Sequence, residues 1–73
     1  MTKIRERRLQ MGLTITDVAK RVECSRPNMS RIDSGKSMPT AEMAVKLEYA
    51  IFLPRWIMRP DIFVVDYVEG GRE

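Results

Sequence analysis

Polar side chains that form hydrogen bonds cluster between residues 25 and 34. With a helical spacing, Met29 and Ile32 turn inward and the polar residues share the opposite, exposed face. Those polar residues are Arg26, Asn28, Ser30 and Arg31. An arginine can give two parallel hydrogen bonds to one partner. This face therefore suits recognition by hydrogen bonding.

The side chains that usually carry catalysis are missing. The chain has no histidine, the commonest general base, no carboxylate pair in an obvious catalytic spacing and no glycine-rich phosphate loop. Its one cysteine, Cys24, excludes an internal disulfide and leaves no zinc site, and it is best interpreted as a small apolar packing residue rather than a reactive thiol. We therefore expect no enzyme, no metal, no other cofactor and no small-molecule ligand.

The polar face belongs to the second of two short helices joined by a tight turn. The first helix, over about residues 15–22, has Thr14 as its N-cap and one apolar stripe. The stripe consists of Ile15, Val18, Ala19 and Val22. The second helix follows another N-cap, Ser25, carries Pro27 in its first turn and is expected to close at Gly35.

Three further helices are predicted around this pair. The first runs from its cap Thr2 to about Met11, one begins after Thr40, and a short turn of helix covers residues 54–58. The helix after Thr40 presents one stripe, made of Met43, Leu47, Ala50 and Ile51. The fold expected is all-α, a five-helix domain over residues 1–60 followed by a C-terminal extension, 61–73.

The two-helix unit resembles the helix-turn-helix of the phage repressor and Cro family of XRE-type regulators. Small or apolar side chains stand where that family packs its two helices together: Val18, Ala19, Val22, Cys24, Met29 and Ile32. Segments 7–14 and 35–40 also look like that family, so the resemblance covers roughly residues 3–52. It implies a lambda-repressor-like fold whose second motif helix enters the major groove of double-stranded DNA.

This resemblance gives the exposed side chains roles toward DNA. Arg26 and Arg31, with Ser30 between them, are the candidates for reading bases, because arginine can bind the O6 and N7 of guanine together. The candidates for holding phosphates are Ser25, Asn28, Lys36, Ser37 and the backbone of the loop. The alternative for each residue is a solvated helix face.

Four positions concern the fit to the family. Arg8 and Asp33 stand where the family has an ion pair between the first and third helices; the alternative is two independent surface charges, worth roughly 0 to 1 kcal/mol if they meet in water. Glu23 stands where glycine is usual, at a corner that tends toward positive φ, so strain or an altered turn is expected. Ile15 replaces a glutamine that touches a phosphate in many relatives.

Charge is distributed unevenly along the chain. Residues 1–36 hold nine Lys/Arg against four acids, whereas residues 37–73 hold four against six. Positive charge beside the motif is what phosphate neutralisation requires; the alternative is that Lys3, Arg5, Arg7 and Arg8 merely solvate a helix.

No apolar run approaches the ~20 residues that span a membrane, and no signal-peptide core follows the basic start. A bacterial cytoplasmic, nucleoid-associated protein is expected.

The last third of the chain is expected to make a homodimer. A domain of 73 residues buries only about 60% of its unfolded surface, so dimerisation would stabilise it. The interface candidates are Leu53, Trp56, Ile57, Phe63, Val65 and Tyr67, with core packing an equal rival at Trp56. Residues 62–68, IFVVDYV, are β-branched and aromatic and predict a strand that pairs across the dimer. An extended tail on the chain's own helices is the alternative.

The function expected from these features is that of a small Cro-like repressor of phage or prophage type. It would bind a pseudo-palindromic operator as a dimer, with half-sites about 34 Å apart. The alternative is an antitoxin or adaptor that uses the same scaffold to bind a protein partner through its C-terminal third.

Overall fold

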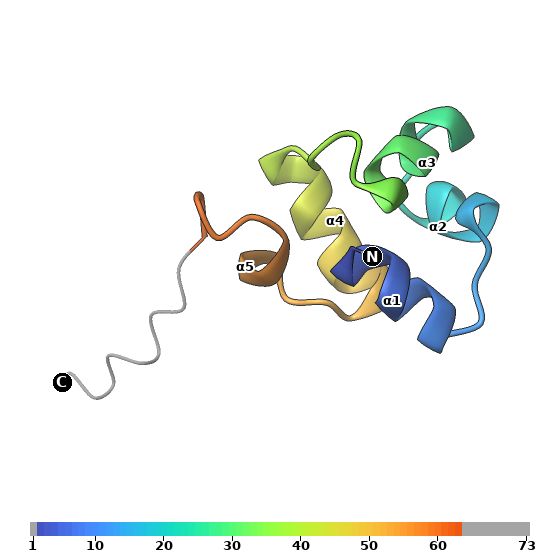
Figure 1. Cartoon of the computed structure of the whole chain (residues 1–73), viewed down its shortest axis with the longest axis horizontal. Coiled ribbons are helices and arrows are strands. Elements are labelled where there is room, and N and C mark those ends of the chain that lie inside the picture. The colour runs from blue at the N-terminus through green and yellow to red at the C-terminus, as the bar shows by residue number, and fades with distance from the viewer. Residues whose placement is uncertain (1, 64–73) are drawn as a thin grey trace, which may run out of the picture.

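The structure is a computed structural model that describes residues 2–63, and this part of the chain is all-helical (Figure 1). The five helices are α1 (Lys3–Gln10), α2 (Ile15–Arg21), α3 (Arg26–Ser34), α4 (Ala41–Ile51) and α5 (Arg55–Met58). Figure 1 shows α2 and α3 together at one end and α5 at the other, with α4 running between them. The predicted all-α, five-helix fold is confirmed.

Ser and Thr side chains start four of these helices, as the sequence predicts. The caps are Thr2, Thr14, Ser25 and Thr40, and each hydroxyl accepts the backbone N–H of the residue three positions on, at 3.0 to 3.2 Å. Asp17 returns the contact by accepting the N–H of Thr14 at 2.9 Å, which completes a capping box. At the other end of α3, Gly35 takes φ +89°, a conformation that glycine adopts without a Cβ penalty.

One apolar core joins the helices. Five side chains are completely buried: Val18 of α2, Val22 at the C-cap of α2, Met29 of α3, and Leu47 and Ile51 of α4. The rest of the core consists of Ile4, Ala19, Ile32, Ala44, Leu53 and Met58. Full burial of a side chain of this size contributes about 1.5 to 3 kcal/mol, so packing between α2, α3 and α4 fixes the relative positions of the motif helices.

The carboxylate of Asp33 is also completely buried, at the inner side of α3. Its Oδ1 accepts from Arg8 Nε at 2.8 Å, and its Oδ2 accepts from Arg8 Nη2 at 3.1 Å and from Arg5 Nε at 2.8 Å. Thr2 Oγ1 donates to the Asp33 carbonyl at 2.7 Å, and Arg8 Nη1 donates to the Leu13 carbonyl at 2.9 Å. The ion pair expected between Arg8 and Asp33 is present, with Arg5 as a second partner and with a buried rather than a surface location.

These contacts set the pKa of Asp33. Burial raises the pKa of the carboxyl, but the hydrogen bonds and charges of Arg8 and Arg5 outweigh it and hold the pKa below its ordinary value. The ionised form is therefore the one that the fold stabilises.

The end of the described chain turns back toward α5. Ile62 and Phe63 both donate their backbone N–H to the Arg59 carbonyl, at 3.1 and 3.0 Å. The Phe63 ring lies 5.5 Å from the Arg55 guanidinium, and Arg55 in turn donates to Glu48. The predicted strand over residues 62–68 thus begins with a turn at Ile62, and residues 64–68 lie outside the described part of the chain. Within residues 2–63, no helix is long and apolar enough to cross a membrane.

Replacing Asp33 by Asn should destabilise the protein strongly. The substitution keeps the side-chain shape but leaves Arg5 and Arg8 without their shared charge, and losing one partner of a buried ion pair costs about 3 to 5 kcal/mol. Urea denaturation followed by circular dichroism measures this loss. As a matched control, Asp61→Asn breaks the bidentate pair with Arg59 at a side chain that is 57% exposed and should cost at most about 1 kcal/mol. Equal losses would contradict the structural role of Asp33.

The stability that Asp33 contributes should disappear in acid. A folded pKa below the unfolded value of about 3.9 means that the contribution is complete above that pH, and that it falls as the pH drops through the folded pKa. An NMR titration of the Asp33 carboxyl carbon measures the folded pKa directly. A midpoint at or above 3.9 would show that burial, and not the two arginines, dominates.

Candidate nucleic-acid interface

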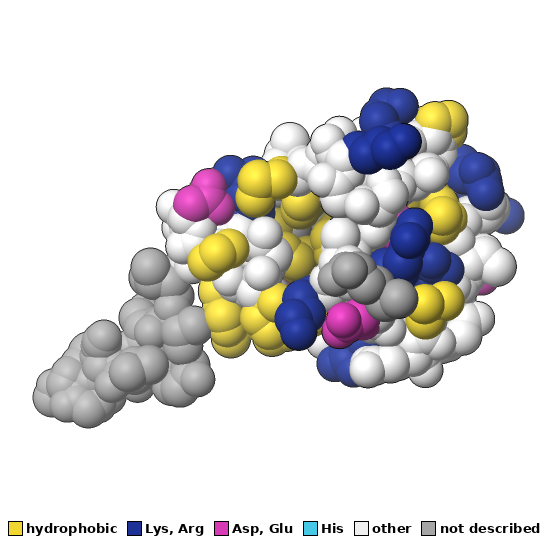
Figure 2. Space-filling model, viewed as in Figure 1, with side chains coloured by type: hydrophobic (Ala, Val, Ile, Leu, Met, Phe, Trp, Pro, Cys, Tyr) yellow, Lys and Arg dark blue, Asp and Glu magenta, His cyan; other side chains and the backbone are white. Residues whose placement is uncertain are grey.

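The inner face of α3 is fixed by the core, and this decides which of its side chains point outward. Met29, Ile32 and Asp33 are buried, whereas Arg26 and Arg31 are exposed and Asn28 and Ser30 are half-buried. The predicted polar face of residues 25–34 is therefore at the surface. Lys and Arg side chains lie over the α2–α3 end in Figure 2, and hydrophobic side chains gather near α5.

Arg31 combines a fixed backbone with an unengaged side chain. Its carbonyl accepts from the N–H groups of Lys36 and Ser37, at 2.9 and 3.2 Å, and from Ser34 Oγ at 3.2 Å. Among residues 2–63, no ion pair or hydrogen bond engages its guanidinium. Arg31 can therefore give its full set of donors to a partner.

Arg26 is exposed at the first turn of α3 and reaches back toward α2. Its Nε donates to Thr16 Oγ1 at 3.2 Å, and neither of its Nη groups has a partner within residues 2–63. The two candidate base readers thus differ, because Arg26 is tied to a neighbouring helix and Arg31 is not.

The predicted phosphate contacts divide into side chains and backbone. The Ser25 hydroxyl accepts the Asn28 N–H at 3.2 Å and keeps its own proton to donate. Lys36 is exposed and Ser37 half-buried. The N–H groups of both residues already donate to the Arg31 carbonyl, and the expectation that the loop backbone binds phosphate stays a prediction. The side chains of Lys36 and Ser37 are the donors left for a partner at this loop.

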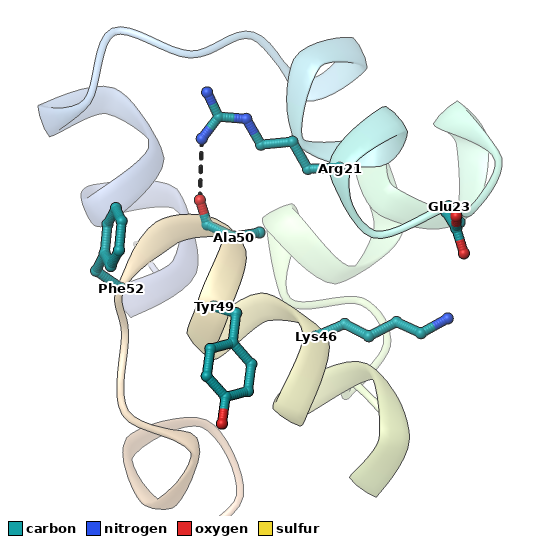
Figure 3. Close-up of a pocket in the computed structure, with 6 residues that line it drawn as sticks. All are labelled: Arg21, Glu23, Lys46, Tyr49, Ala50 and Phe52. Atoms are coloured by element: carbon teal, nitrogen blue, oxygen red, sulfur yellow. Dashed lines mark hydrogen bonds between the residues drawn. The ribbon is translucent and has the colours of Figure 1, made fainter.

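Most arginines of the first half of the chain are bound within the protein. Besides Arg5 and Arg8 at Asp33, Arg7 Nη2 donates to the Phe52 carbonyl at 3.0 Å. Arg21 Nη1 donates to the Ala50 carbonyl at 3.0 Å, across an open groove of about 560 Å³ between α2 and α4 (Figure 3). These guanidinium groups join separate segments of the fold, and the neutralisation of phosphates by the basic first helix stays a prediction.

The residues that pack and cap this unit coincide with a known sequence pattern. The family model described as Helix-turn-helix matches residues 4–53. The chain belongs to the helix-turn-helix family. It is a DNA-binding transcription regulator of the XRE type, which confirms the family part of the resemblance. No curated protein and no solved structure is similar enough to this helix-turn-helix protein to be matched with it.

The corner of the helix-turn-helix is made without glycine. Glu23 takes φ +58°, in the left-handed region, and Cys24 then donates its N–H to the Ala19 carbonyl at 3.0 Å to close the turn. The expected strain is present at this corner. Ile15 is half-buried against the core, so this position packs the helix-turn-helix instead of binding a phosphate.

The residues predicted for dimerisation have different environments in this helix-turn-helix protein. Leu53 is only 8% exposed and belongs to the core of its own chain, so its assignment to an interface is corrected: the left-handed Phe52 before it, at φ +56°, turns the chain inward there. Ile57 is 44% exposed, and Trp56 and Phe63 are half-buried. Val65 and Tyr67 lie outside the described residues.

Sequence reasoning missed Arg5 and Thr16. Arg5 stands three residues before Arg8, a spacing that places both on one face of α1, so the sequence held a signal for its contact with Asp33. The contact between Thr16 and Arg26 joins two helices and carries no sequence signal of its own.

Replacing Glu23 by Gly should stabilise the helix-turn-helix. Glycine adopts the left-handed conformation without a Cβ clash, and relief of this strain is expected to raise the free energy of unfolding by about 0.5 to 1 kcal/mol, net of the added freedom of the unfolded chain. Urea denaturation compares this variant with Glu23→Ala, which removes the same side chain but keeps the strain. A gain in the alanine variant equal to that in the glycine variant would assign the effect to the carboxylate instead.

Proposed function

We propose that this protein is a sequence-specific repressor of Cro type that binds double-stranded DNA through α3. The observation that carries the proposal is the division among its arginines. Arg5, Arg7, Arg8 and Arg21 are held by groups of the protein. The guanidinium of Arg31 and the two Nη groups of Arg26 have no partner within residues 2–63. Both side chains are exposed on α3, the helix that this family places in the major groove.

In this proposal α3 supplies both kinds of DNA contact. Arg26 and Arg31 read base edges, with guanine as the partner to which arginine can give two hydrogen bonds, and Ser30 between them permits close approach or touches a base. Ser25, Asn28, Lys36 and Ser37 hold the phosphates on either side with their side chains. Repression follows from occupying a promoter in the bacterial nucleoid.

A dimer is part of the same proposal, because a pseudo-palindromic operator needs two α3 helices related by a twofold axis. Apolar surface near α5 supports this. Ile57 and Ile62 are 44% and 45% exposed, Met38 is 61% exposed, and Trp56 and Phe63 are half-buried beside them in the sequence. Half-site centres about 34 Å apart would place the two copies of α3 in successive major grooves.

The exposed apolar side chains after α3 also favour a second candidate, an antitoxin or adaptor that binds a protein partner. Tyr49 and Phe52 are 71% and 67% exposed, and they lie beside the groove drawn in Figure 3. A monomer would leave all of this surface in water, and a partner protein could cover it.

Selection of bound sequences from random duplex DNA by the purified protein separates the two functions. A two-fold-symmetric site about one helical turn between half-site centres supports the repressor, and binding should weaken steeply with salt. Sedimentation equilibrium at tens of micromolar gives the mass of the free protein. Weak binding without sequence preference, together with a monomeric mass, would contradict the repressor and favour the protein-binding function.

Two substitutions should distinguish base reading from phosphate binding on the selected site. Arg31→Ala is expected to cost about 1 to 3 kcal/mol on the cognate site and to relax one base position, whereas Lys36→Ala should weaken binding to all DNA alike and reduce the salt slope by about one. Fluorescence anisotropy on cognate and random duplexes at several salt concentrations measures both effects. Equal losses on the two duplexes for Arg31→Ala would contradict its role as a base reader.

A further inference from the structure

The guanidinium of Arg26 is held at one of its three nitrogens. Nε donates to Thr16 Oγ1 at 3.2 Å, and this contact crosses from the start of α3 to the start of α2. Both side chains are exposed, so the hydrogen bond contributes little to the core. Its effect is on the direction of the arginine.

We propose that Thr16 is a positioning residue for base recognition by Arg26; this inference rests on the proposed function. Because Thr16 occupies Nε, the donors left to Arg26 are its two Nη groups. The arginine therefore approaches a base end-on, with one Nη on the O6 and the other on the N7 of guanine, and not side-on through Nε.

A second effect is on the conformational freedom of the side chain. A free arginine loses much rotamer freedom when it binds, and holding it beforehand lowers that loss. Arg31 has no such partner among the described residues. The two arginines of one recognition helix thus differ, with Arg26 preorganised toward one base and Arg31 free to adapt.

The substitution Thr16→Val tests this role, because valine keeps the shape of threonine and has a similar helix propensity. Binding is measured on the duplex selected by the wild-type protein and on the three duplexes that change the base pair read by Arg26. That base pair is identified as the one whose preference is lost in Arg26→Ala. Thermal unfolding of each variant confirms that the fold is retained.

The expected result for Thr16→Val is a loss of about twofold to tenfold in affinity on the selected duplex, the range of one hydrogen bond. Preference at the Arg26 base pair should shrink by the same factor, and binding to random DNA should not change. Thr16→Ser restores the hydroxyl and should restore the preference. In an Arg26→Ala background, Thr16→Val should have no further effect.

Three outcomes would overturn the inference. If the wild-type protein prefers one base pair at the Arg26 position and Thr16→Val keeps that preference, Thr16 has no positioning role. The proposed function would still stand. A further loss from Thr16→Val in the Arg26→Ala background means that Thr16 contacts DNA on its own. A wild type without any sequence preference removes both the inference and the proposed function.

Discussion

The buried carboxylate of Asp33 constrains the rest of this small domain. A charge removed from water costs several kcal/mol unless it is paired and hydrogen-bonded, and Asp33 can meet this requirement only with α1 beside it, since Arg5 and Arg8 supply the donors. Its backbone carbonyl is also held by Thr2. The contact therefore ties the start of the chain to α3 and turns that side of α3 inward, so the opposite side, with Arg31, faces out, while Arg26 is exposed at the first turn of the helix.

The same chemistry explains why a net positive charge of +3 does not by itself identify the DNA-binding surface. Guanidinium groups here bind the backbone carbonyls of Phe52, Ala50 and Pro39, because a carbonyl, like a phosphate oxygen, accepts from the same planar donors. In a chain this short, arginine hydrogen bonds hold helices together that a larger protein would hold together by apolar packing. In the proposed function, the surface for DNA consists of the cations that remain unengaged among the described residues, chiefly on α3 and the loop after it.

The sequence predicted the features that depend on neighbouring residues. Threonine and serine caps, the glycine that ends α3 and the apolar stripes of α2 and α4 follow from spacing within one helix, and the structure has them. The prediction of an ion pair between Arg8 and Asp33 rests on the family resemblance, because nothing in the local sequence relates residues so far apart.

The remaining features depend on where one helix lies against another. Leu53 was assigned to an interface because the sequence does not show that Phe52 adopts a left-handed conformation, which sends the next side chain into the core. The hydrogen bond between Thr16 and Arg26 depends on the angle of the Glu23 corner. The engaged amide of Lys36 follows from the glycine cap itself, so that contact could have been predicted.

In the proposed function, arginines of similar chemistry divide into those that hold the fold and those that read DNA. NMR of the arginine Nε–H groups, recorded while the selected duplex is added to labelled protein, tests this division most directly. The Arg26 and Arg31 signals should shift on binding, while those of Arg5 and Arg8 should stay in place. Equal shifts at Arg5 and Arg8 would mean that the α1 arginines leave Asp33 for the phosphates, and that no such division exists.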